Sequence, residues 1–229
     1  LDRCIGLLVD HQGEIEEALC EDFGHRSKDA SRFTDVASSI SALQYSKKHL
    51  AKWMRPEKRK VEFPLGLLGS KAEVHYQPKG VVGVISPWNF PVNLTFTPLA
   101  GIFAAGNRAM IKPSEFTERT SELMKEMFAK AFAEDEVAVI TGGPEVGAEF
   151  TKLPFDHIIF TGATSIAKHV MRAAADNLVP LTLELGGKSP VVLGRSADLD
   201  KAAARIMAGK TLNAGQICLA PDYAFVPKE

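Results

Sequence analysis

From residue 71 onward, short β-branched segments alternate with longer segments of helical periodicity, and this alternation constrains the fold more than any other feature of the sequence. Strands that alternate with helices form crossover units, and such units build a mostly parallel sheet with helices on both faces. The sequence therefore predicts an α/β fold. The expected strands are residues 73–77, 81–86, 109–112, 137–141, 157–161 and 181–184. The expected helices are residues 92–105, 117–133, 144–151, 165–176 and 199–208.

The part of the chain before residue 71 has a different pattern. Residues 1–22 and 31–54 place apolar side chains at intervals typical of helices, with Ser31 in the position of an N-cap. The segment 55–70 combines a basic run with proline and glycine, which predicts a solvated loop. We therefore expect helices and a loop to precede the sheet.

Charge and composition argue against several classes of function. The 229 residues carry 27 basic and 28 acidic side chains, so the formal net charge of −1 gives no electrostatic reason to expect a nucleic acid or a membrane surface as a partner. The longest apolar stretch, residues 92–105, is shorter than the roughly 20 residues that span a bilayer. Three cysteines are too few for a disulfide framework, which favours a reducing, cytoplasmic location. The six histidines lack ligand-like spacing, so no metal site is expected.

Polar and glycine-rich sequences follow four of the expected strands. Because open parallel sheets bind ligands beyond the carboxyl ends of their strands, we expect these sequences to share a ligand site. The dinucleotide fingerprint Gly-x-Gly-x-x-Gly and a complete P-loop are both absent from the sequence, so neither motif identifies the ligand. The four sequences are Ser86-Pro87-Trp88-Asn89, Lys112-Pro113-Ser114-Glu115, Thr141-Gly142-Gly143-Pro144 and Phe160-Thr161-Gly162-Ala163-Thr164.

Three further residues suggest acyl chemistry. Cys218 lies in a turn-like glycine and amide context, Glu184 ends an expected buried strand before two glycines, and Asn89 lies near two prolines. A thiolate that attacks a carbonyl, an amide that stabilises the oxyanion and a carboxylate that activates water would together perform such chemistry. Each residue also has a structural interpretation: Cys218 as a small buried hydrophobe, Glu184 as the partner of a cation and Asn89 as a helix cap.

Five motifs in a fixed order carry a resemblance to a known family. They are Pro87-Trp88-Asn89-Phe90-Pro91, Lys112-Pro113-Ser114-Glu115, Phe160-Thr161-Gly162, Leu183-Glu184-Leu185-Gly186-Gly187-Lys188-Ser189-Pro190 and Gly215-Gln216-Ile217-Cys218. From about residue 27 to its end, the chain resembles the NAD(P)-dependent aldehyde dehydrogenases. Residues 218–223 are similar to the class 3-like branch, and residues 22–27 are similar to bacterial coniferyl aldehyde dehydrogenases.

The resemblance implies a role for each of the three residues. Cys218 would be the nucleophile that forms a thiohemiacetal and, after hydride transfer to a nicotinamide, a thioester. Asn89 would donate its side-chain amide to the oxyanion, together with the backbone N–H of Cys218. Glu184 would activate the water that hydrolyses the thioester to a carboxylic acid. That the aldehyde is aromatic, such as coniferyl aldehyde, is implied by the resemblance alone.

The resemblance also implies which residues bind the cofactor. A carboxylate such as Glu115 at the ribose would repel a 2′-phosphate, so NAD is the expected cofactor and NADP the alternative. The implied residues are Lys112 and Glu115 at the adenosine ribose, Gly143 and Pro144 at the adenine, Gly162, Ala163 and Thr164 at the pyrophosphate, and Pro87 and Trp88.

The resemblance implies two domains. Residues 1–184 would form a dinucleotide-binding domain, with N-terminal helices, a hairpin strand near 71–79 and a Rossmann-like core at 80–184. Residues 185–229 would start a second α/β domain, the catalytic domain, which we expect to be truncated in this chain. The full-length protein would be a homodimer that takes a small aldehyde as its substrate.

Other functions stay open at this point. A nucleotide-binding fragment would hold NAD and perform no chemistry, and a thiol acyltransferase or amidase would use Cys218 without a cofactor. A reductase that makes aldehydes from acyl-CoA or acyl phosphate is a further alternative. Such relatives tend to lack the hydrolytic glutamate, so Glu184 argues against the reductase.

Overall fold

The computed structural model describes residues 1–228, and it contains a five-stranded sheet in the order β5-β4-β3-β6-β7. Every neighbouring pair in this sheet is parallel. The α/β fold with a mostly parallel sheet is therefore confirmed. The strands are β3 (Val81–Ile85), β4 (Arg108–Lys112), β5 (Val137–Val139), β6 (His157–Gly162) and β7 (Leu181–Leu185).

Helices connect these strands and cover both faces of the sheet. One apolar cluster packs β3 and β4 against α5, α6 and the N-terminal helices, through side chains such as Val84, Phe96 and Phe128. A second cluster, which includes Phe160 and Val170, lies between β6 and α8 on the other face. The expected helices over this part of the chain are confirmed to within a few residues. The connecting helices are α5 (Asn93–Ala104), α6 (Glu118–Ala131), α7 (Pro144–Phe150) and α8 (Thr164–Ala175).

Alternation along β3 assigns its side chains to the two faces. Val82 and Val84 belong to the first cluster, whereas Gly83 faces the ring of Phe155. A Cβ at Gly83 would lie 2.9 Å from that ring. Both faces of β3 are buried, and successive side chains point to opposite faces. The Phe155 ring can lie this close to the strand only because Gly83 has no side chain on that face.

The N-terminal helices differ from the expected ones at their boundaries. The segment expected to be helical over 1–22 is two helices that break at His11, and the helix expected to begin at Ser31 begins earlier, after Ser27. Ser31 is buried inside a continuous helical segment and is therefore not an N-cap. The elements are α1 (Asp2–Asp10), α2 (Gln12–Phe23), α3 (Lys28–Ser31), the π-helix η1 (Arg32–Ala37) and α4 (Ser38–Trp53).

Two aspartates of this N-terminal segment cap helices of the sheet domain. Asp35 Oδ1 accepts hydrogen bonds from the backbone N–H groups of Val92 and Asn93, both at 3.1 Å, where α5 begins. Asp22 accepts from two backbone N–H groups at the start of α6, at 3.0 and 2.8 Å. Because the first N–H groups of a helix have no partner within the helix, a carboxylate there satisfies them and interacts favourably with the helix dipole.

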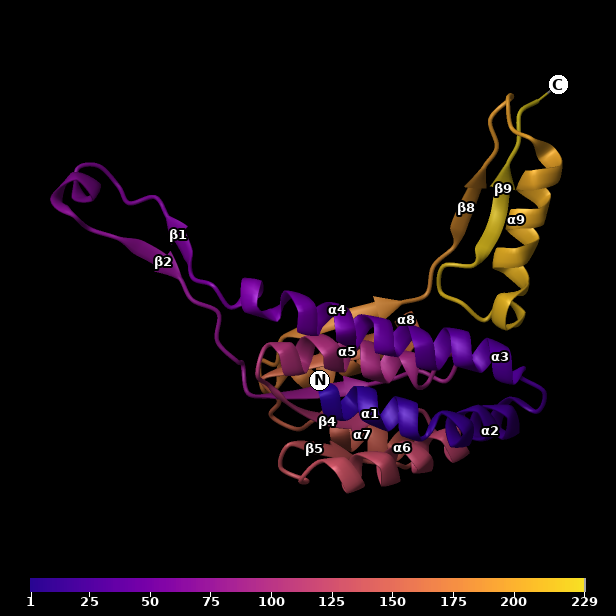
Figure 1. The fold of residues 1–229 in the computed structure, drawn as a ribbon, viewed down its shortest axis with the longest axis horizontal. Helices are drawn as coiled ribbons and strands as arrows, with labels where there is room; N and C mark the ends of the chain where they lie inside the picture. The colour runs from indigo at the N-terminus through magenta and orange to yellow at the C-terminus, as the bar shows by residue number, and fades with distance from the viewer. Residues whose placement is uncertain (229) are drawn as a thin grey trace.

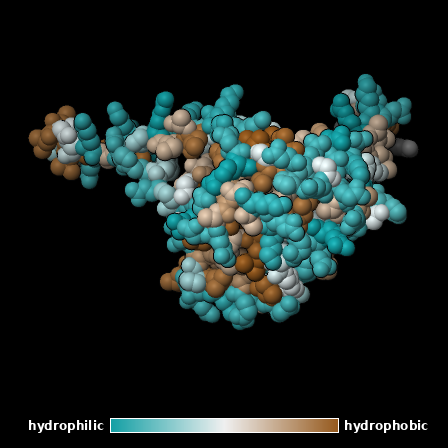
Figure 2. Space-filling model, turned by 60° about the horizontal axis from the view of Figure 1, so that its bottom comes forward, coloured by the Kyte–Doolittle hydropathy of each residue, from teal (hydrophilic) through white to brown (hydrophobic). Residues whose placement is uncertain are grey.

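A hairpin arm projects from the body of the molecule. It consists of β1 (Glu57–Arg59), the 3-10 helix η2 (Leu65–Leu68) and β2 (Ala72–Val74), and β1 and β2 are antiparallel (Figure 1). Its far end is hydrophobic and exposed (Figure 2). The solvated loop expected over 55–70 thus includes a strand, and the strand expected over 73–77 is shorter and lies in the arm.

The last part of the chain forms a second, smaller β-α-β unit. It contains β8 (Ser189–Val192), α9 (Leu199–Thr211), the 3-10 helix η3 (Leu212–Gly215) and β9 (Pro221–Phe225), and β8 pairs with β9 in parallel. This unit extends away from the five-stranded sheet (Figure 1). Several of its apolar side chains, such as Leu199 and Phe225, are exposed. Within residues 1–228, no helix has both the length and the apolar character that crossing a membrane requires.

Candidate active site

The carboxyl ends of the parallel strands define the edge of the sheet where the candidate residues collect. The chain runs from β3 outward to β4 and β5, then returns to the other side of β3 as β6, so the strand order reverses between β3 and β6. Open α/β sheets bind ligands in the crevice at such a reversal. The loop after β3 carries Asn89, and the end of β6 carries Gly162.

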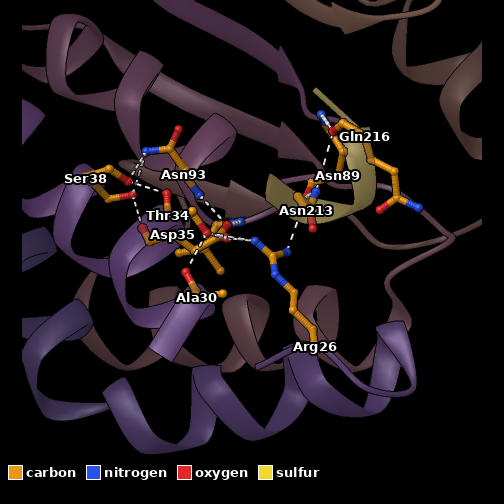
Figure 3. A network of polar contacts seen from close by, with 11 residues as sticks. Arg26, Ala30, Thr34, Asp35, Ser38, Asn89, Asn93, Asn213 and Gln216 are labelled. Atoms are coloured by element: carbon orange, nitrogen blue, oxygen red, sulfur yellow. Dashed lines mark hydrogen bonds and ion pairs between the residues drawn. The ribbon is translucent and has the colours of Figure 1, made fainter. Parts of the chain in front are cut away.

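The side-chain amide of Asn89 points toward the segment that leads to Cys218. Its Nδ2 donates a hydrogen bond to the backbone carbonyl of Gln216 at 2.8 Å (Figure 3). Helix α5 is capped by Asp35 instead, so the helix-cap interpretation of Asn89 is wrong. Because an asparagine amide has two N–H donors, this bond orients the group and leaves a second donor for a ligand.

A left-handed turn precedes the cysteine. Asn213, Ala214 and Gly215 have φ values of 49°, 55° and 78°. Such conformations cost non-glycine residues on the order of 1–3 kcal/mol each and persist where the surroundings hold them. The side chain of Asn213 donates to the carbonyl of Asn89 at 2.9 Å, so two asparagines link the turn and the Asn89 loop in both directions (Figure 3).

Cys218 lies against the segment that follows β7. A Cβ at Gly187 would lie only 2.9 Å from the carbonyl oxygen of Cys218, so the missing side chain permits this approach. The cysteine is exposed, which contradicts its interpretation as a buried hydrophobe. Glu184, three residues before Gly187, is also exposed, and the side chains of β7 alternate between half-buried and exposed. The expected burial of that strand is therefore wrong.

A buried ion pair contacts the Asn89 loop. Arg26 Nη2 is 2.6 Å from Asp35 Oδ2, and the two side chains are 5% and 0% exposed. Burial lowers the pKa of Arg26 and raises the pKa of Asp35, while the contact between them opposes both shifts. Arg26 also donates to the carbonyl of Asn89 at 3.2 Å. Sequence reasoning noted Arg26 only as part of the motif at 22–27. It did not identify Asp35, because the N–H groups that Asp35 caps lie more than fifty residues later in the chain.

Two of the candidate cofactor residues lie together at the end of β4. Lys112 is buried, and its Nζ donates to the carbonyl of Pro113 at 2.8 Å and lies 3.4 Å from Glu115 Oε2. The carboxylate is therefore near the edge of the sheet, where ribose hydroxyls could donate to it. The lysine supplies a positive charge beside it.

The other candidate cofactor residues lie at two helix starts and in the Asn89 loop. Gly143 is the N-cap of α7 and Pro144 its first residue. Ala163 is the N-cap of α8, without a side-chain cap, so the first N–H groups of this twelve-residue helix suit an anion such as a pyrophosphate. Trp88 is partly exposed and lies 6.3 Å, centroid to centroid, from the ring of Phe23. Pro87, Gly162 and Thr164 are adjacent to these residues in the chain.

A cavity of about 320 Å³ opens beside the turn. One wall comes from the N-terminal segment, including Phe23 and Arg26, and the other from the residues before Cys218, including Leu212 and Asn213. The cavity leaves room for an organic group next to the linked asparagines. In the part of the chain described, no cluster of three or more histidine, cysteine or carboxylate side chains could hold a metal ion.

Known proteins resemble this chain in sequence. The sequence profile described as "Aldehyde dehydrogenase family" matches residues 1–229. A probable coniferyl aldehyde dehydrogenase of Caulobacter vibrioides is 70% identical over 230 residues, which cover 100% of this chain and 47% of that protein. The chain thus spans about half the length of this curated relative.

Solved structures resemble the chain in fold as well. The substrate-bound state of Staphylococcus aureus AldH matches with a TM-score of 0.92 and 37% identity, over 98% of this chain and 48% of that chain. Mycobacterium tuberculosis aldehyde dehydrogenase complexed with NAD+ matches with a TM-score of 0.87 and 28% identity, over 99% of this chain and 46% of that chain.

Proposed function

Because the chain belongs to the aldehyde dehydrogenase family, we propose that the whole protein oxidises an aldehyde to a carboxylic acid with a nicotinamide cofactor. The observation that carries this proposal is the convergence of three distant segments at one edge of the sheet. Asn89 donates to Gln216, two residues before Cys218, and Gly187 lies against the Cys218 carbonyl. These two backbone contacts support the proposal that a thiol, an amide and a carboxylate act together.

The chemistry starts at the sulfur. The Cys218 thiolate attacks the aldehyde carbon, a carbon–sulfur bond forms, and the carbonyl oxygen gains negative charge. That charge is stabilised by the second N–H of the Asn89 amide and by the backbone N–H of Cys218. Loss of one such donor costs on the order of 3–4 kcal/mol of barrier. A bound nicotinamide supplies the acceptor for the hydride that leaves the carbon.

Release of the product requires water. Glu184 accepts a proton from a water molecule that attacks the thioester carbon, the carbon–sulfur bond breaks, and the carboxylic acid leaves while Cys218 returns to the thiolate. This role is supported by the chain path, because β7 leads into Gly186 and Gly187, and Gly187 lies against the Cys218 carbonyl.

The cofactor would lie across the carboxyl ends of β3, β4 and β6. Lys112 and Glu115 would bind the adenosine ribose, Gly143 and Pro144 would line the adenine, and the start of α8 would bind the pyrophosphate. The Glu115 carboxylate favours NAD over NADP by charge repulsion of a 2′-phosphate. Replacing Glu115 by Gln should therefore raise kcat/KM for NADP relative to NAD. An unchanged ratio would show that Glu115 does not set the preference.

The substrate is proposed to be an aromatic, conjugated aldehyde such as coniferyl aldehyde. The similarity to the Caulobacter vibrioides protein supports this choice. Residues 185–229, which expose apolar side chains such as Leu199 and Phe225, would then belong to a catalytic domain, and the whole protein would act as a homodimer.

An assay of the whole protein with coniferyl aldehyde tests the proposal. The absorbance of reduced nicotinamide should rise with NAD, Cys218→Ser should abolish the rise, and Cys20→Ser should serve as a control. Glu184→Gln should stop turnover after one burst of NADH, because the thioester accumulates. Aldehyde-dependent turnover by Cys218→Ser at the normal rate would refute the mechanism.

The 229-residue chain by itself is proposed to bind NAD with little or no turnover. Cys218 and Glu184 are exposed here, and the electrostatic stabilisation of an oxyanion is much weaker in water than in a dry site. Calorimetry with NAD and the same absorbance assay measure the two properties. Appreciable NADH production by this chain would contradict the expectation.

A further inference from the structure

Arg26 contacts the Asn89 loop at the backbone carbonyl of Asn89. Its Nη1 donates to the carbonyl oxygen of Asn89 at 3.2 Å, and its Nη2 donates to Asp35 Oδ2 at 2.6 Å and to Thr34 Oγ1 at 2.8 Å (Figure 3). The side chain is 5% exposed. The planar, five-donor shape of a guanidinium can serve several acceptors at fixed angles, which a lysine ammonium cannot reproduce.

The partners of Arg26 fix it in place. Asp35 is bonded to the guanidinium on one side and to the N–H groups of Val92 and Asn93 on the other. The guanidinium carbon lies 4.7 Å from the centroid of Phe23 and 5.2 Å from that of Phe90. The Asn89 loop is thus held at two points, by Arg26 at its middle and by Asp35 at its end.

The carbonyl that Arg26 binds is also the one that Asn213 binds. Asn213 Nδ2 donates to it at 2.9 Å, so both lone pairs of this oxygen are used. The Asn89 amide in turn donates to Gln216 in the turn before Cys218. The backbone and the side chain of Asn89 therefore connect the Arg26 guanidinium to the turn before Cys218.

We propose that Arg26 is a positioning residue that aims the Asn89 side-chain amide at the oxygen of the substrate. The inference rests on the proposed function and adds a residue to it. Arg26 does not touch the substrate. It fixes the peptide group of Asn89, and a small rotation of that group would move the amide away from the developing charge.

A double-mutant cycle on the whole protein tests this role. Arg26→Lys keeps the charge that Asp35 needs, so the protein should fold, but the planar contact with the Asn89 carbonyl is lost. We expect kcat to fall about tenfold, with KM for NAD unchanged, since displacement of a catalytic group by a fraction of an ångström lowers rates by such factors. Arg32→Lys is the matched control, because Arg32, six residues later in the N-terminal segment, is ion-paired with Glu16 of α2 and not with the Asn89 loop.

The decisive comparison is made in the Asn89→Ala background, where no side-chain amide remains to be aimed. If Arg26 acts through that amide, Arg26→Lys should change kcat there by less than about twofold. An equal loss of kcat in both backgrounds, or a loss in Arg26→Lys no larger than in Arg32→Lys, would overturn the proposal and leave Arg26 with a structural role.

A measurement that does not depend on enzyme activity tests the role of Arg26 separately from the proposed function. Should the unmutated protein fail to oxidise aldehydes, the function is wrong, but the contact can still be tested by amide hydrogen exchange. Arg26→Lys should then raise exchange in residues 86–93 and 213–218, and Arg32→Lys should leave both segments unchanged. Equal exchange in all three proteins would overturn the positioning contact as well.

Discussion

Replacing Asp35 by Asn should destabilise the chain far more than a surface substitution of the same type. Asparagine keeps an oxygen that can accept from the N–H groups of Val92 and Asn93, so most of the helix cap survives. What disappears is the negative charge 2.6 Å from Arg26, whose side chain is 5% exposed. The substitution therefore isolates the ion pair from the cap.

The magnitude follows from the burial of both partners. Leaving one charge of a buried pair without its partner costs about 3–5 kcal/mol. A typical domain has a total stability of about 5–15 kcal/mol, so the loss is a large part of it. Asp29→Asn is the matched control: Asp29 is 90% exposed and 3.4 Å from Arg32, and surface pairs contribute about 1 kcal/mol or less.

Urea unfolding of the 229-residue chain at neutral pH, followed by far-ultraviolet circular dichroism, measures the effect. The double variant Arg26→Met/Asp35→Asn should recover much of the stability, because it removes both charges together. A loss below about 1 kcal/mol for Asp35→Asn would refute the reasoning, since it would mean that Arg26 does not depend on an ionised Asp35.

Three further predictions concern other parts of the structure. Iodoacetamide at mildly alkaline pH should label the exposed Cys218 in the native chain and spare Cys4, because burial raises the pKa of the Cys4 thiol to about 11; peptide mass spectrometry that finds Cys4 modified before unfolding would contradict this. The hydrogen bond from Arg3 lowers the pKa of Glu136 from 4.5 to about 2, so the stability from this contact is present above pH 4.5 and is lost as the pH falls toward 2. In Glu136→Gln, the urea midpoint should fall less steeply with pH over this range than in the unmutated chain. Parallel profiles for the two proteins would contradict the prediction. Gly187→Ala should lower kcat of the whole protein on the order of tenfold, because the new Cβ would lie 2.9 Å from the Cys218 carbonyl; steady-state kinetics with full kcat would show that the turn tolerates the shift.

The elements of the sheet domain could be predicted because their signals are local. The β-branched run at 81–86 and the apolar helix at 92–105 appear within a few residues of those positions, as β3 and α5. The boundaries before residue 71 were less accurate. The helix start at Lys28 and the strand β1 depend on packing and on pairing with β2, which periodicity does not record.

The candidate site could be predicted only in part. Asn89 and Cys218 stand out in the sequence because proline and glycine surround them, and the structure brings their segments together. The exposure of Glu184 was not predicted, because an apolar run does not reveal which elements cover the two faces of its strand. The assigned roles of all three residues stay predictions.

The sequence by itself determined the alternation of strands and helices, and with it the parallel sheet and the edge that carries the candidate site, because side-chain periodicity and turn residues act over a few positions. Only the tertiary structure decided which distant side chains contact the loop and the helix at that edge. Asp35 caps a helix that begins more than fifty residues later, and Arg26 contacts the carbonyl of Asn89. Such bonds depend on which helices pack together, and the burial that makes them strong exists only once the chain has folded.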